Sequence, residues 1–267
     1  MNIVHSFASS ACSDKTFLMH MAYFVLSCLY AKESGFNIKL HADNRTAEFL
    51  SVCPYDNIIA DLEGIDWPAS RLYAWSKFVS MKDEPLGTIH IDGDVFLKDS
   101  ILLEKMKFDN YDCIVQNIEL PVSPWGFGWK EASKSFENCE YPEWANRKCN
   151  AMYNCGIIGF NNQTLKDKYF ETYWDMVGQY RKYGTELCNV PDLIIEQQFL
   201  KDLTKDYKVK ELLDFDDLTG SADNIGYQHV IGVKGKELSK VLSLIKKHNL
   251  NIYNKIINCY GQIYNNR

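Results

Sequence analysis

The chain has 267 residues, of which 46% are hydrophobic, and a formal net charge of −6. This length and composition are typical of one large globular domain with a full core. The acidic balance argues against a general nucleic-acid-binding protein, because neutralising phosphates requires a basic surface. The longest apolar run, from Phe17 to Tyr30, is shorter than the about 20 residues of a membrane-spanning helix. No secretory leader is evident, and we expect a soluble, cytoplasmic protein.

The nine cysteines are odd in number and scattered, without any Cys-x-x-Cys pair. This usage is typical of reduced thiols in a cytosolic protein, where most cysteines serve as small core residues. No spacing among them indicates a zinc cluster.

The N-terminal half alternates short β-rich runs with helical patterns. It predicts strands at 3–7, 37–42, 58–60 and 88–91, and helices at 14–33, at 44–52 and from Pro68 onward. Ser13 and Gly35 are typical start and stop signals for the first of these helices. Such alternation predicts an α/β fold with a mainly parallel twisted sheet flanked by helices.

The second half is less regular. We expect strands at 113–118 and 152–160, helices at 163–183 and 191–205, and a loop or strand at 225–233. An insertion at 121–150 separates the two strands and is rich in aromatic residues: Trp125, Phe127, Trp129, Phe136, Tyr141 and Trp144. These rings are suited to stacking on a saccharide acceptor, or they form a lid that packs on its own aromatic residues.

The C-terminal segment, residues 236–267, is basic and amphipathic. It contains six Lys or Arg residues and one Glu, which gives a local net charge of +5. Two interpretations are open. The segment is an ordinary helix docked on the sheet with its lysines in water, or it makes peripheral contact with an anionic membrane, at the inner face.

The most informative motif is the run from Gly87 to Leu97, in which Asp92 and Asp94 follow a predicted buried strand. The carboxyl ends of strands in an open α/β sheet face the ligand crevice. Two carboxylates so close together are unfavourable unless a cation lies beside them, and a hard divalent metal that also holds the phosphates of a nucleotide diphosphate satisfies that requirement. A second Asp-x-Asp, at Asp214 and Asp216, lacks the middle glycine and the preceding strand, and we interpret it as a solvated turn.

A possible third metal ligand occurs at His229, since a neutral imidazole completes a coordination shell well. Gly232 lets the backbone approach a ligand closely, and Lys234 or Lys236 would neutralise a diphosphate. The alternative is that His229 is an ordinary surface or core histidine. Phosphate-binding loops of the Gly-x-x-x-x-Gly-Lys and Gly-x-Gly-x-x-Gly types do not occur in the sequence.

The ordered set of motifs resembles the GT-A-fold glycosyltransferases, especially the retaining group of glycogenin-like and bacterial galactosyltransferase-like enzymes. The segments that carry the resemblance are 71–77, 91–95, 153–158, Glu196-Gln197, and His229 with Gly232. The resemblance implies a single Rossmann-like domain over residues 1–267. Residues 1–100 would form a nucleotide-binding half, residues 101–235 a sugar and acceptor half, and residues 236–267 a helical segment.

The resemblance also implies roles for individual residues. Asp92, Asp94 and His229 would bind Mn²⁺ or Mg²⁺ together with a nucleotide-sugar, most simply a UDP-sugar. The remaining donor contacts would come from His5, Ser6, Phe7, Arg71, Lys77, Gly93, Asn154, Gly156, Gly232 and Lys234. Glu196 and Gln197 would lie near the reaction centre as catalytic residues. Each position also has an ordinary structural interpretation: His5 as a buried core group, the 154–156 segment as a strand with a tight turn, and Glu196 and Gln197 as a solvated helix face.

The function that these motifs predict is metal-dependent transfer of a sugar to an acceptor, such as a saccharide of a bacterial surface glycan. Paired acids also serve sugar-nucleotide nucleotidyltransferases, although the segment 8–12 lacks the glycine and cation that such enzymes need after the first strand. A third possibility is a carbohydrate- or nucleotide-binding protein without catalytic activity. The oligomeric state stays open.

Overall fold

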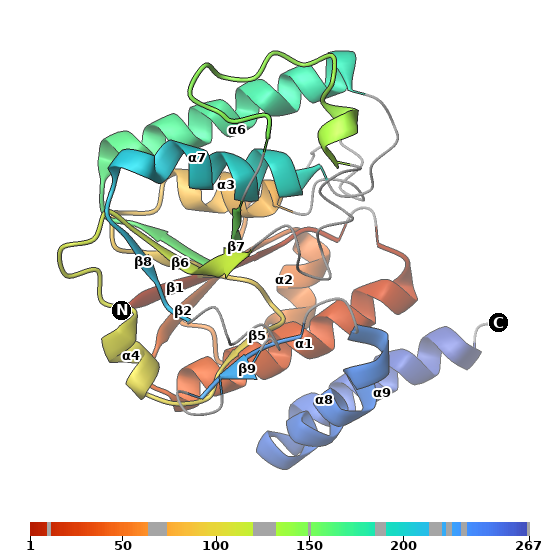
Figure 1. The fold of residues 1–267 in the computed structure, drawn as a ribbon. Coiled ribbons are helices and arrows are strands. Elements are labelled where there is room, and N and C mark those ends of the chain that lie inside the picture. The colour runs from red at the N-terminus through yellow and green to blue at the C-terminus, as the bar shows by residue number, and fades with distance from the viewer. Residues whose placement is uncertain are drawn as a thin grey trace. The chain divides into compact units, whose positions relative to one another are not determined.

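The structure is a computed structural model that describes residues 1–9, 12–63, 74–119, 132–148, 151–184, 191–213, 221–222, 226–230 and 234–265. Figure 1 shows the ribbon of the chain with its helices and strands labelled. The chain divides into two compact units. Unit 1 comprises residues 1–66, 90–107 and 217–267, and unit 2 comprises residues 67–89 and 108–216.

Parallel strands form the centre of unit 1. Strands β1 (Asn2–Phe7), β2 (Asn37–Ala42) and β3 (Asn57–Ala60) pair in parallel, and β4 (Ile89–Ile91) extends the order to β3-β2-β1-β4. Four consecutive residues of β1 and all three of β4 are buried. Such continuous burial, which here includes the polar His5, Ser6 and His90, is typical of strands covered on both faces.

Helix α1 (Asp14–Glu33) begins and ends where the sequence predicts. The Ser13 hydroxyl accepts a hydrogen bond from the Thr16 amide, and Gly35 follows the last turn with a φ of +88°. Only glycine adopts that left-handed conformation at little cost, so the helix stops there. The shorter helix α2 (Asn44–Leu50) is capped by Asp43, whose carboxylate accepts from the Thr46 amide.

Unit 1 also contains a small antiparallel sheet of three strands. It contains β5 (Val95–Leu97), β10 (Tyr227–His229) and β9 (Ser221–Ala222) in the order β5-β10-β9, and the short helix α4 (Ile101–Lys105) follows β5. In the β5–β10 register His229 lies opposite Val95. This pairing joins segments more than 130 positions apart in the sequence.

The basic C-terminal segment forms two helices, α8 (Lys234–His248) and α9 (Leu250–Asn265), rather than one continuous helical segment. Asn249 separates them, and its side chain accepts from the Ile252 amide, which starts α9. Both helices pack against α1 and bury the apolar side chains Val241, Ile245, Ile252 and Ile256. The apolar face of the segment therefore docks on helix α1, whereas the first of the two interpretations above expected docking on the sheet.

Unit 2 is built around β6 (Cys113–Glu119), which pairs antiparallel with β7 (Met152–Phe160) and parallel with β8 (Val209–Glu211). Helices α3 (Trp75–Lys82) and α6 (Gln163–Tyr183) pack together, with the Phe78 ring stacked on Tyr173 at 3.4 Å between centroids. Residues 64–73, and with them the predicted helix start at Pro68, lie outside the described residues.

The helix expected at 191–205 is in fact three successive helical types. A π-helix, η1 (Leu193–Gln198), leads into α7 (Phe199–Leu203) and then into the 3₁₀ turn η2 (Thr204–Asp206). A π-turn admits one more residue per turn than the α-helical pattern, and such turns are frequent at functional sites. Glu196 and Gln197 both belong to it.

The predicted α/β class, a mainly parallel sheet flanked by helices, is confirmed. The units divide the chain differently from the expected halves. Residues 67–89 fall in unit 2, and the C-terminal helices belong to unit 1 because they bury their apolar face on α1. Among the described helices, none has an apolar stretch long enough to cross a lipid bilayer.

Candidate metal centre and neighbouring site residues

Asp92 and Asp94 lie in the turn that connects β4 to β5. The Val95 amide donates to the Asp92 carbonyl at 3.0 Å, which closes the turn. The side chain of Asp92 is 36% exposed and that of Asp94 only 10%. Gly93 separates them, and the ring of Phe24 from α1 lies directly against its Cα.

His229 joins the two carboxylates through the strand pairing of β10 with β5. The Val230 amide donates to the Asp94 carbonyl at 3.0 Å, and His229 Nε2 lies 3.5 Å from Asp94 Oδ1. One ligand atom from each of Asp92, Asp94 and His229 lies within 4.8 Å of the other two. No other group of three or more His, Cys, Asp or Glu residues with this geometry occurs in the part of the chain that the structure describes.

This donor set fits a divalent cation. Carboxylate oxygens suit Mg²⁺ and Mn²⁺, and the single imidazole suits Mn²⁺ better than Mg²⁺. Three protein ligands leave further coordination positions for water or for the oxygens of a ligand. The chemistry of the three side chains is thus that of a cation site with room for a second molecule.

His5, in strand β1, is a buried histidine whose pKa is affected by the charge of Asp94. The imidazole of His5 has no exposed surface; its Nδ1 lies 2.8 Å from the Tyr55 hydroxyl and its Nε2 3.1 Å from that of Ser27. Burial lowers the pKa of His5 to about 3, and the charge of Asp94 opposes that shift only partly. His5 is a neutral core group, as its alternative interpretation expects.

Ser6 and Phe7 are the next two residues of β1 and make their own side-chain contacts. Ser6 Oγ lies 2.8 Å from Nε2 of His90 in β4, and His90 Nδ1 lies 3.7 Å from Asp92 Oδ1. The ring of Phe7 packs on His20 and Phe24. His90 was not among the residues predicted from the sequence, although a histidine within an otherwise apolar strand, two residues before Asp92, is a visible signal.

In unit 2 the predicted residues Lys77 and Glu196 form a buried ion pair. Lys77 Nζ donates to Glu196 Oε1 at 2.6 Å and to the Cys155 carbonyl at 2.8 Å, and the two side chains are 8% and 6% exposed. The Tyr169 hydroxyl donates to the Glu196 carbonyl at 2.9 Å. Glu196 therefore lies in a buried network and not on the solvated helix face of its alternative interpretation.

Asn154 and Gly156 form a locally bonded segment of β7. The Asn154 amide group donates to Glu119 Oε1 at 2.7 Å, and its oxygen accepts from the Gly156 amide at 2.9 Å. The side chain of Gln197, unlike that of Asn154, has an unsatisfied acceptor: its buried Oε1 has no hydrogen-bond donor among the described residues. A buried acceptor of this kind is costly unless another molecule supplies a donor.

Several predicted residues cannot be placed. Arg71, Gly232, Trp125, Phe127, Trp129 and the second Asp-x-Asp lie outside the described residues. Lys234 begins α8, and Lys236 is exposed on that helix. Three described aromatics of the insertion contact rings of the protein: Phe136 stacks on Tyr180, and Tyr141 and Trp144 meet Phe199 edge-on. These three fit the self-packing interpretation.

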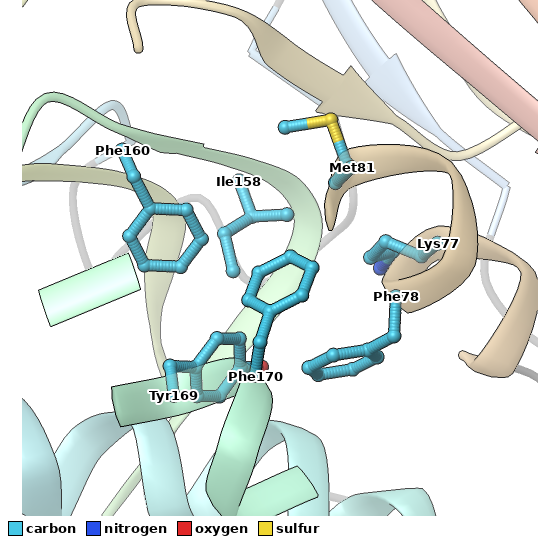
Figure 2. A pocket seen from close by; sticks show the side chains of 7 residues that line it. All are labelled: Lys77, Phe78, Met81, Ile158, Phe160, Tyr169 and Phe170. Atoms are coloured by element: carbon cyan, nitrogen blue, oxygen red, sulfur yellow. The ribbon is translucent and has the colours of Figure 1, made fainter. Parts of the chain in front are cut away.

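Two cavities occur away from the acidic cluster. One, of about 10 Å³, lies among Lys77 and the apolar side chains of α3, β7 and α6 (Figure 2). It has room for about one water molecule at most, and its walls are apolar. The other, of about 340 Å³, lies in unit 1 and is lined by residues of α1, α2 and α9.

Comparison with known proteins shows a fold similar to glycosyltransferases of known structure, at low identity. The galactosyltransferase LgtC, in complex with donor and acceptor sugar analogs, aligns with a TM-score of 0.48 and 12% identity, over 90% of this chain and 95% of LgtC. The glycosyltransferase GlyE of Streptococcus pneumoniae gives 0.48 and 9% over 98% and 64% of the chains, and mouse xyloside xylosyltransferase 1 gives 0.43 and 15% over 87% and 98%.

Comparison by sequence identifies one family and no curated relative. No curated protein matches the chain. One family model does match, and it covers residues 1–264, almost the whole sequence. The chain therefore belongs to the family of unknown function DUF6734.

Proposed function

We propose that this protein is a metal-dependent glycosyltransferase that takes a sugar from a nucleotide-sugar, most simply a UDP-sugar. The observation that carries the proposal is the cluster of Asp92, Asp94 and His229, whose ligand atoms lie within 4.8 Å of one another. Two carboxylates at the end of a buried strand of an α/β sheet have the position expected for ligand binding. Their charges require a cation, and a diphosphate would share it.

In this proposal Asp92, Asp94 and His229 hold Mn²⁺ or Mg²⁺. The cation neutralises charge on the diphosphate leaving group when bound. Gly93 would contact the donor through its backbone, and Ser6, Phe7, Arg71, Gly232 and Lys234 would supply further donor contacts. Lys236 is the alternative cation for the diphosphate. Because His5 is buried, we assign it a structural role within unit 1 instead of a donor contact.

The resemblance assigns the sugar contacts to Glu196, Gln197, Asn154 and Gly156. Lys77 keeps Glu196 in place through their buried ion pair, so we assign Glu196 an electrostatic and positioning role toward the sugar. Gln197 has a buried side-chain oxygen ready to accept a hydrogen bond, and a sugar hydroxyl is a suitable donor. Asn154 and Gly156 would line the sugar pocket. Most of the rate enhancement would then come from positioning and electrostatic stabilisation.

The acceptor would be a saccharide, with the insertion at 121–150 as its binding region.

The basic C-terminal helices are suited to peripheral contact of a cytoplasmic protein with the inner face of an anionic membrane. Lys236, Lys240, Lys246 and Lys247 are exposed on α8, while its apolar residues pack inward. Flotation with vesicles that contain anionic lipid would test the contact. We expect binding that weakens with salt, and no binding at low salt would exclude it.

The test of the activity is release of nucleoside diphosphate. The protein is incubated with each common UDP-sugar and Mn²⁺, and released UDP is measured with and without EDTA. We expect release that requires the metal and is lost in Asp92→Asn and Asp94→Asn. Asp214→Asn, in the second Asp-x-Asp of the sequence, is the matched control and keeps wild-type activity.

The same assay separates the rival functions. A nucleotidyltransferase would release pyrophosphate instead of UDP. A binding protein without catalytic activity would release neither, and its saccharide binding would survive replacement of both aspartates. Absence of UDP release and of UDP-sugar binding for every donor would exclude the proposal.

A further inference from the structure

One side chain near the acidic cluster is neither a candidate metal ligand nor part of the apolar core. His90 is only 2% exposed on β4, and its ligand atoms fall outside the group formed by Asp92, Asp94 and His229. Its two ring nitrogens face different polar groups. Nε2 is 2.8 Å from Ser6 Oγ, and Nδ1 is 3.7 Å from Asp92 Oδ1.

These contacts favour one arrangement of protons. The Ser6 hydroxyl donates to Nε2 of a neutral imidazole, which leaves the ring proton on Nδ1, directed at the carboxylate of Asp92. The reverse tautomer would place a bare nitrogen lone pair against a carboxylate, which is electrostatically unfavourable. Ser6 thus orients the imidazole ring of His90 and favours the tautomer in which Nδ1 carries the proton.

Asp92 needs such support more than Asp94 does. Its side chain is 36% exposed, against 10% for Asp94, so surrounding atoms restrict its rotation less. A hydrogen-bond donor behind a ligating carboxylate orients it and raises the affinity of the site. At 3.7 Å the buried Nδ1 is not hydrogen-bonded to Asp92, and polar contacts that are long without ligand often tighten into hydrogen bonds when the complex forms.

We propose that His90, held by Ser6, is a positioning residue that presents the carboxylate of Asp92 to a divalent cation. The inference rests on the proposed function, since it assigns Asp92 to a metal. It concerns side chains of this protein alone, and binding of Mn²⁺ in the absence of nucleotide and sugar tests it directly.

The experiment uses two replacements of nearly equal polarity. In His90→Asn the side-chain amide nitrogen takes the place of Nδ1 and still donates to Asp92. In His90→Gln the amide reaches the position of Nε2 beside Ser6 instead. The affinity of the full-length protein for Mn²⁺ is measured from the EPR signal of free Mn²⁺ and by calorimetry. We expect His90→Gln to weaken Mn²⁺ binding by about 10- to 100-fold, and His90→Asn to keep the Mn²⁺ affinity close to that of the wild type.

Ser6→Ala is the second variant and leaves the residue at position 90 unchanged. We expect weaker Mn²⁺ binding than in wild type, because the ring loses the group that fixes its proton. Unchanged binding in Ser6→Ala, or equal affinities for the Asn and Gln variants, would overturn the inference while leaving the metal site intact. If wild type itself binds no Mn²⁺, the proposed function fails first. Should His90→Gln not fold, Ser6→Ala decides alone.

Discussion

The ring of Phe24 closes over the Cα of Gly93, so the glycine between the two aspartates has no room for a side chain. A Cβ at this position would lie 2.3 Å from Phe24 Cε2 and 2.5 Å from Cζ. Gly93 does not have a positive φ, so its requirement is steric rather than conformational. The long helix α1 thereby fixes the path of the turn that carries Asp92 and Asp94.

Gly93→Ala is therefore expected to destabilise the fold and to weaken Mn²⁺ binding. The methyl group must displace the ring or the turn, and overpacking of this kind costs about 1–3 kcal/mol. Gly178→Ala is the matched control, since Gly178 is exposed in α6 with nothing near its Cβ position, and we expect about 0.5–1 kcal/mol of added stability. Urea unfolding and Mn²⁺ titration measure both effects. Full stability and affinity in Gly93→Ala would contradict the steric argument.

Local signals explain which elements the sequence predicted well. The bounds of α1 follow from the Ser13 cap and from Gly35, both of which act within one turn of the helix. Short elements such as α4 and β8 have too few residues for a recognisable pattern, and β8 forms through its non-local pairing with β6. The π-turn of η1 was missed because its apolar residues also fit α-helical spacing.

The site was predictable in its residue types but not in its contacts. Asp92 and Asp94 were found from a buried strand followed by two acids, and His229 from its neighbouring glycine and lysines. What brings His229 to them is the pairing of β10 with β5, a non-local contact that no local pattern reveals. The ion pair of Lys77 with Glu196 joins residues 119 positions apart for the same reason.

Mn²⁺ is expected to raise the melting temperature of the wild-type protein. A ligand that binds only the folded state adds about 2.7 kcal/mol of stability when its concentration is 100 times its Kd. Asp94→Asn removes the least exposed carboxylate of the cluster and should abolish the increase. Scanning fluorimetry over a Mn²⁺ series, with Asp214→Asn as control, measures it. An equal shift in Asp94→Asn would place the metal elsewhere.

The Lys77–Glu196 pair predicts a marked non-additivity. Lys77→Met leaves a buried carboxylate without its partner and is expected to cost about 3–5 kcal/mol, whereas adding Glu196→Met to it should recover much of that loss. Lys107→Met is the control, because its pair with Glu104 has the same 2.6 Å distance but is exposed, and we expect about 0–1 kcal/mol. Denaturant unfolding of the full double-mutant cycle gives the coupling. Additive effects at Lys77 and Glu196 would mean that water screens the pair.

His5 predicts a loss of stability in mild acid. Its pKa is about 3 in the folded protein because burial disfavours the charged ring, against 6.5 for an unperturbed histidine. Below pH 6.5 the unfolded chain takes up a proton that the folded protein does not, so the unfolded state gains about 1.4 kcal/mol per pH unit until about pH 3. His5→Asn keeps a polar group near Tyr55 but cannot titrate, so its stability should fall less steeply between pH 6.5 and 4. Urea unfolding at each pH, with EDTA present, compares the two slopes. Parallel slopes would show that His5 takes up its proton in the folded protein as readily as in the unfolded chain.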